Sequence, residues 1–170
     1  MFIAIDKGHN CINDIGAQGI KSEDALTNEL GEKLIELLNK SGHKTVDVTP
    51  KLANNLSHSL IQRVSSANLS KADLFVSLHF NAFNGMAYGS EVYAVSQTGR
   101  KYAKNIVNEI SKIGYHNRGV KTANFYVLKH TSMPAVLVEC CFVDSTSDMA
   151  RYDADTMAKA IFNGITGKKN

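Results

Sequence analysis

Several features common in other protein classes are scarce in this sequence of 170 residues. It has no tryptophan and only two prolines, which argues against a tryptophan-lined carbohydrate groove and against a long proline-rich linker. The three cysteines, Cys11, Cys140 and Cys141, are an odd number and two of them are adjacent. A disulfide framework is therefore not expected, no spacing forms a metal knuckle, and all three are predicted to be buried, inert thiols.

Charge of one sign and long apolar runs are scarce as well. The formal net charge is only +3, and without a clustered basic stripe no nucleic-acid partner is expected. No window approaches the ~18 apolar residues of a membrane span. The apolar run at residues 2–5 meets Asp6, whereas a secretory signal needs about 7 to 15 apolar residues. We therefore expect synthesis and folding in the cytoplasm, and work elsewhere only after release.

The pattern of apolar residues predicts strands that alternate with helices along residues 1–170. Leu26, Leu30, Leu34, Leu37 and Leu38 recur at helical spacing. The remaining elements follow from similar periodicities and from turn residues. Helices are predicted over about 24–41, 57–70, 99–113 and 154–165, and strands over about 2–6, 45–49, 73–79, 89–95, 125–128 and 135–142. This alternation predicts a single α/β domain with a mostly parallel twisted sheet.

Three of the predicted strands end in or carry a titratable side chain. His9 follows the first strand, His79 ends the strand over 73–79, and Glu139 lies inside the apolar run AVLVECCF. Because ligands bind beyond the carboxyl ends of parallel strands, we expect these groups at one edge of the sheet. A lone histidine is usually a solvated or hydrogen-bonded residue. Their shared position favours metal ligation, and imidazole is the commonest protein ligand of zinc.

Two carboxylates are candidates for a functional role, and the sequence supports such a role more strongly for Glu139 than for Glu23. An ionised Glu139 is expensive to bury without a partner, so it is either half of a buried ion pair, a strand-end residue or a functional acid or base. Glu23 by spacing alone is an acidic residue in the first turn of a helix. Two histidines with one carboxylate form a known catalytic zinc set. A further carboxylate can take the proton from the attacking water and pass it to the leaving amine.

The sequence resembles the zinc-dependent N-acetylmuramoyl-L-alanine amidases of bacterial autolysins and clostridial phage endolysins (amidase type 3). Matching segments run from the first strand to about residue 150, and their order and spacing are more specific than any one of them. They are IDKGH at 5–9, Glu23 ahead of GH at 42–43, RVSSAN at 63–68, ADLFVSLHFNA at 72–82, GSEV at 89–92, NRGV at 117–120 and PAVLVE at 134–139.

The resemblance implies a sheet of about six strands flanked by helices on both faces. It also implies one Zn²⁺ ion held by His9, Glu23 and His79, with Glu139 as the catalytic carboxylate. Asn81 and Arg118 would line the site and orient the stem peptide. The implied reaction is hydrolysis of the amide bond between N-acetylmuramic acid and L-alanine in peptidoglycan, by a bacteriolytic cell-wall hydrolase. We also expect the protein to be a monomer.

Two departures from the family pattern concern the metal ligands. Lys7 and Asn10 replace the small residues that often surround the first histidine. Asn28 follows Glu23 by five residues instead of the usual four, which leaves Asp24 or Glu29 as substitutes. The distance to GH at 42–43 favours Glu23.

Three other functions are compatible with parts of this pattern. A zinc peptidase acting within the stem peptide would use the same metal chemistry. A non-catalytic wall-binding module would not need Glu139, and a structural α/β domain would make the convergence at the sheet edge accidental. The remaining histidines are predicted to be capping or solvated residues, although His130 is close enough to the expected site to contact substrate; they are His43, His58, His116 and His130.

Overall fold

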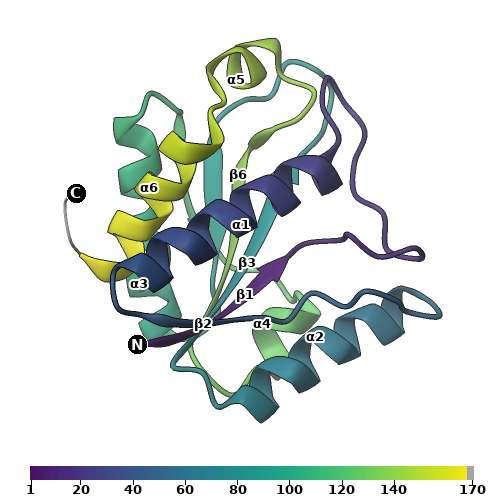
Figure 1. Cartoon of the computed structure of the whole chain (residues 1–170). Helices are drawn as coiled ribbons and strands as arrows, with labels where there is room; N and C mark the ends of the chain where they lie inside the picture. Colours follow the sequence, from purple (N-terminus) through teal and green to yellow (C-terminus); the bar gives the residue numbers. More distant parts are fainter. Residues whose placement is uncertain (168–170) are drawn as a thin grey trace.

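The alternating segments fold into one sheet with helices on both of its faces (Figure 1). The computed structural model describes residues 1–167. Six strands lie in the order β2-β1-β3-β6-β4-β5. Their bounds are β1 Phe2–Lys7, β2 Lys44–Asp47, β3 Leu74–Asn81, β4 Ser90–Tyr93, β5 Asn117–Lys121 and β6 Ala135–Phe142. β4 is antiparallel to β6 and parallel to β5, whereas the pairs among β2, β1, β3 and β6 are parallel.

Within residues 1–167, six helices accompany the strands, and several start where the sequence offers a capping side chain. Their bounds are α1 Glu23–Lys40, α2 Leu56–Ser70, α3 Gln97–Lys112, α4 Tyr126–His130, α5 Thr146–Arg151 and α6 Ala154–Thr166. The predicted N-cap Ser22 accepts a hydrogen bond from the Ala25 backbone N–H, which satisfies one of the free amides of the first turn of α1. Gly42 follows the end of α1 with φ of 82°, a conformation that favours glycine.

The two faces of the sheet pack against different helices. Along β1, Ile3 and Ile5 join the apolar cluster with α1, α3 and α6, while Ala4 joins the cluster with α2 and α4. This follows from the period of two in a strand, which sends successive side chains to opposite faces. The prediction of a single α/β domain with helices on both faces is thus confirmed (Figure 1).

Three segments differ from the expectation. Residues 125–128 were predicted as a strand, but Tyr126–His130 form the short helix α4, because four consecutive apolar residues have no period that separates strand from helix. The sixth strand is instead β5, Asn117–Lys121, a mostly polar segment at the edge of the sheet. The helix α5, Thr146–Arg151, was not anticipated.

All three cysteines are free and buried, as predicted from their number and spacing. Among the helices of residues 1–167, none has the length and apolar character needed to cross a membrane.

Candidate metal centre

The register of the three central strands brings the predicted site residues together. β3 pairs with β6 so that His79 is the direct partner of Glu139. β1 extends its pairing beyond its last residue, because the Gly8 backbone N–H donates to the Leu78 carbonyl at 2.9 Å. His9, the next residue, therefore lies beside His79. Their rings form an edge-to-face pair with centroids 4.9 Å apart.

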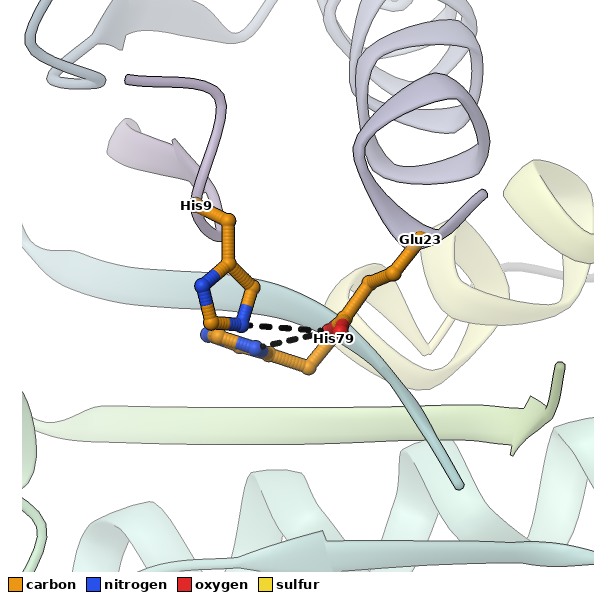
Figure 2. Close-up of side chains that lie close together, drawn as sticks. All are labelled: His9, Glu23 and His79. Carbon is orange, nitrogen blue, oxygen red and sulfur yellow. Dashed lines mark hydrogen bonds and ion pairs between the residues drawn. The ribbon is translucent and has the colours of Figure 1, made fainter. Parts of the chain in front are cut away.

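Glu23 completes a cluster of three potential ligands (Figure 2). Its Oε1 atom lies 3.1 Å from His79 Nδ1 and 3.4 Å from His9 Nε2. One ligand atom from each of the three residues falls within 4.8 Å of the others. Within residues 1–167 this is the single group of three or more histidine, cysteine or acidic residues that meets such a criterion. Two imidazole nitrogens and a carboxylate oxygen form a donor set suited to a divalent metal ion.

The backbone around α1 fixes the Glu23 carboxylate. Glu23 is the first residue of the helix, so its side chain extends from the helix start toward the ends of β1 and β3. Its Oε2 accepts from the Ala17 N–H at 2.8 Å, and its Oε1 accepts from the Phe80 N–H at 3.1 Å. Burial opposes its ionisation, but the nearby His79 and His9 hold the pKa of Glu23 well below its usual range. The carboxylate is therefore an oriented anion.

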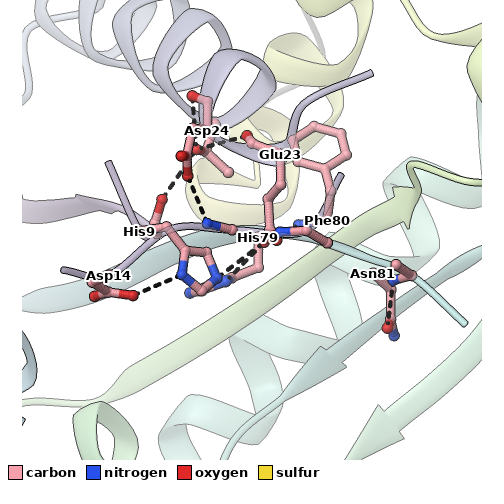
Figure 3. A network of polar contacts seen from close by, with 12 residues as sticks. His9, Asp14, Glu23, Asp24, His79, Phe80 and Asn81 are labelled. Carbon is pink, nitrogen blue, oxygen red and sulfur yellow. Dashed lines mark hydrogen bonds and ion pairs between the residues drawn. The ribbon is translucent and has the colours of Figure 1, made fainter. Parts of the chain in front are cut away.

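The two alternative carboxylates are engaged elsewhere. Asp24 Oδ1 accepts from the backbone amides of Gly16 and Asn10, at 3.0 and 3.3 Å (Figure 3). Asp24 thus holds the loop between β1 and α1. Glu29 is exposed on α1 and does not belong to the ligand cluster. Glu23 is the acidic residue of α1 that the fold places beside both histidines.

His9 is oriented by a second carboxylate that the sequence did not reveal. Its Nδ1 lies 2.8 Å from Asp14 Oδ1, which leaves Nε2 toward Glu23 (Figure 3). Burial alone would lower the pKa of His9, but the hydrogen bonds to Asp14 and Glu23 outweigh it and raise the pKa to about 10. The acidic surroundings therefore favour a positive charge at this point, which is also what a metal cation requires.

Glu139 lies next to the cluster in a different electrostatic state. Its Oε2 atom is buried and has no hydrogen-bond partner within residues 1–167. Burial raises the pKa of Glu139 to about 7, and the negative charges of Glu23 and Glu91 add to the effect against the opposing histidines. A carboxyl group with a pKa near neutrality, beside a potential metal site, can both accept and return a proton.

Asn81 and Arg118 meet around Glu91, a buried residue to which no function was attached from the sequence. Arg118 Nε donates to Glu91 Oε2 at 2.7 Å, and the Asn81 amide donates to Oε1 at 3.4 Å. Lys121 and Tyr93 also bind this carboxylate. Glu91 is the direct partner of Glu139 across β4 and β6, so the group lies beside the candidate catalytic carboxylate.

A cleft of about 280 Å³ opens over these groups. His9, His79 and Glu139 line one part of it, and apolar side chains from α2 and the segment at 125–127 form another wall. The other histidines lie outside the ligand cluster; His130, for example, stacks on Tyr126 with centroids 4.2 Å apart. A cleft that combines a metal-ligand set with a carboxyl group of raised pKa is the kind of site used by metal-dependent hydrolases.

Comparisons with known proteins agree with this class. The sequence pattern of the family described as N-acetylmuramoyl-L-alanine amidase matches residues 3–167. The amidase CwlM of Bacillus licheniformis is 35% identical over 166 residues, covering 95% of this chain and 64% of the relative. The amidase LytC of Bacillus subtilis is 35% identical over 173 residues, covering 95% of this chain and 34% of the relative.

A solved structure extends the comparison to the fold. The catalytic domain of the CD27L endolysin targeting Clostridia Difficile superposes with a TM-score of 0.93 at 27% sequence identity, covering 100% of this chain and 99% of that one. The chain belongs to the N-acetylmuramoyl-L-alanine amidase family, which confirms the resemblance found in the sequence. It spans between 34% and 64% of the length of the two curated amidases.

Proposed function

We propose that residues 1–170 form a catalytic domain that hydrolyses the amide bond between N-acetylmuramic acid and L-alanine in peptidoglycan, with one zinc ion. Membership of the amidase family over residues 3–167 supports the reaction. The observation that carries the proposal is the cluster of His9, Glu23 and His79 beside Glu139. All four residues come from one chain, so we also propose that the protein acts as a monomer.

His9, Glu23 and His79 would hold the zinc ion. When bound, zinc would polarise the scissile carbonyl and lower the pKa of water. Glu139 accepts the proton of the attacking water at its carboxylate and returns it to the leaving amine of L-alanine. Its pKa of about 7 in the metal-free protein supports a group that can carry out both transfers.

Asn81 and Arg118 would orient the stem peptide beside the scissile bond. Their attachment to the buried Glu91 supports this role, because it fixes both side chains near Glu139. Arg118 and Lys121 together place two positive charges around one buried carboxylate. The surplus positive charge favours an acidic group of the substrate.

Action on the cell wall after release from the cytoplasm is part of the same proposal. Similar proteins include the endolysin of Bacillus phage SPP1, at 35% identity over 171 residues. Cleavage inside the stem peptide and binding without catalysis are the competing outcomes.

Mass spectrometry of digested peptidoglycan tests the proposal. Purified walls are incubated with the protein as isolated, with the protein after treatment with a chelator, and with zinc restored. We expect free stem peptides that begin with L-alanine, lost on chelation and regained with zinc. Fragments cut within the peptide would overturn the choice of bond. If walls are bound but no zinc-dependent product forms, the catalytic proposal is wrong.

A further inference from the structure

Within residues 1–167, Arg63 is the largest polar side chain that is fully buried, and it contacts the segment that carries His9. It is 1% exposed and extends from α2 toward the end of β1. All three guanidinium nitrogens are engaged. Nε donates to Ser59 Oγ at 3.1 Å, Nη1 donates to the Asp6 carboxylate, and Nη2 donates to Asp14 Oδ2 at 3.1 Å. A planar fork of five donors suits such a multiple contact, which a lysine cannot reproduce.

Most of these contacts converge on the short segment that carries His9. Besides Asp6 and Asp14, Arg63 donates to the backbone carbonyls of Lys7 and His9. It therefore holds the chain before, at and after the first proposed ligand. A structural ion pair that merely attached α2 to β1 would need only Asp6.

The His9 segment has a backbone that needs such support. His9 and Asn10 have φ values of 61° and 58°, in the left-handed region that non-glycine residues rarely adopt. Strained conformations of this kind persist only where surrounding contacts determine them. One such contact is the hydrogen bond that Arg63 donates to the His9 carbonyl oxygen. Another is the hydrogen bond that the Asn10 side-chain amide donates to the Gly8 carbonyl oxygen.

Asp14 connects Arg63 to the imidazole of His9 through hydrogen bonds to both residues. Its Oδ2 accepts from Arg63 and, at 2.7 Å, from Ser59, while its Oδ1 is bound to His9 Nδ1. The ring is thereby held with Nε2 toward Glu23, 3.4 Å from its Oε1. Carboxylates that bind the outer nitrogen of a ligating histidine fix its tautomer and its orientation.

We propose that Arg63 is a positioning residue which, through Asp14 and the His9 carbonyl, sets the first metal ligand in place before the ion arrives. The inference rests on the proposed function in one respect, namely that His9, Glu23 and His79 bind zinc. It adds that the affinity for zinc depends on the buried Arg63–Asp14 pair, whose side chains are not among the three proposed ligands.

Zinc affinity of purified variants tests this role separately from catalysis. Asp14→Asn keeps the side-chain shape but loses the negative charge. Arg63→Lys keeps the positive charge, but a lysine cannot make the multiple contacts of Arg63 with Asp6, Asp14 and the backbone carbonyls. We expect the zinc dissociation constant, measured by competition with a fluorescent chelator, to rise about 10- to 100-fold in each. Amidase activity should return toward the wild-type level when excess zinc is supplied. If Arg63→Lys fails to fold, Asp14→Asn carries the test.

Ser77→Ala is the matched control for a purely structural role. Ser77 donates to Asp6 Oδ2 at 2.7 Å, whereas Arg63 binds the other oxygen of the same carboxylate. We expect lower thermal stability but an unchanged zinc affinity. The proposal is overturned if Asp14→Asn and Arg63→Lys bind zinc like the wild type, or if Ser77→Ala loses as much affinity as they do. A wild-type protein that binds no zinc would overturn the metal site itself, and this inference with it.

Discussion

Replacing Glu139 by glutamine should remove a specific dependence of stability on pH from the metal-free protein. The Oε2 atom of Glu139 is buried without a hydrogen-bond partner in residues 1–167. Burial is the main cause that raises its pKa from 4.5 to about 7. Glutamine has a similar shape and stays uncharged throughout this range, so the comparison isolates the charge of a single residue.

The direction of the effect follows from where the proton binds more tightly. Below pH 4.5 the carboxyl group is protonated in both the folded and the unfolded chain, and burial costs no charge. Between pH 4.5 and about 7 the unfolded chain loses the proton while the folded protein keeps it. The free energy of unfolding of the wild type therefore falls, relative to the variant, as the pH rises through this window.

The size of the effect follows from the same two values. They differ by about 2.5 pH units, which corresponds to at most about 3 kcal/mol at 1.36 kcal/mol per unit. It is an upper limit because Glu139 as a whole residue is only partly buried, and water screens part of the cost. Relative to the wild type, Glu139→Gln should thus gain as much as about 3 kcal/mol between pH 4.5 and pH 8.

Urea unfolding followed by circular dichroism, with a chelator present throughout, provides the measurement. Glu36→Gln is a suitable control, because Glu36 is exposed on α1 and paired with Lys40, which holds the pKa of Glu36 below its usual value. No gain with rising pH is expected there. If wild type and Glu139→Gln changed in parallel with pH, Glu139 would not be a buried carboxyl group of raised pKa.

Two further substitutions test the geometry of the ligand cluster. In Gly8→Ala, the new Cβ would come within 2.4 Å of the His79 ring and 2.6 Å of the Leu78 carbonyl oxygen. Because His79 would have to move, we expect the zinc dissociation constant to rise at least about tenfold. Unchanged zinc binding in a titration would contradict the placement of His79. Glu23→Gln should abolish tight zinc binding, whereas Glu29→Gln, on the exposed face of α1, should leave zinc affinity unchanged. If Glu29→Gln lost affinity and Glu23→Gln kept it, the ligand would be Glu29.

The central part of the fold could be predicted because local and tertiary preferences agree there. The strands β1, β3 and β6 are short apolar runs, and their parallel order follows from the helices between them. The helix α1 has both a capping serine and a leucine stripe. Because ends of parallel strands share one edge, the sequence placed His9, His79 and Glu139 together, and their register in the sheet agrees.

The edge of the sheet could not be predicted in the same way. β5 contains Asn117, Arg118, Gly119 and Lys121, which have no apolar alternation to mark a strand. Tertiary contacts make this segment a strand. Val120 pairs with Val92 of β4, and Arg118 and Lys121 form ion pairs with the buried Glu91. The opposite error at 125–128 has the same origin, because Val127 and Leu128 are buried in the apolar cluster with α2, and a short buried apolar run fits a strand as well as a helix.

The residues that support the site were harder to see than the ligands. Asp14 lies in an irregular loop, and Arg63 is an isolated cation in an otherwise unremarkable amphipathic helix. Sequence periodicity describes which face of an element is apolar, but it does not indicate that two distant charged residues are buried against each other. The signal available for Arg63 was its place in the family segment at 63–68, which gave a match but no role.

Glu23 owes its place in the ligand cluster to the fold and not to its spacing along the sequence. An acidic residue in the first turn of a helix is common because the helix dipole favours it, so its position along the chain said nothing about a metal. The fold adds that the start of α1 faces the ends of β1 and β3, and that the backbone amides of Ala17 and Phe80 hold the two carboxylate oxygens. Asp24, one residue further on, turns to the loop amides instead. Helix geometry therefore separates two adjacent carboxylates into a candidate ligand and a loop anchor, a distinction that residue spacing alone cannot make.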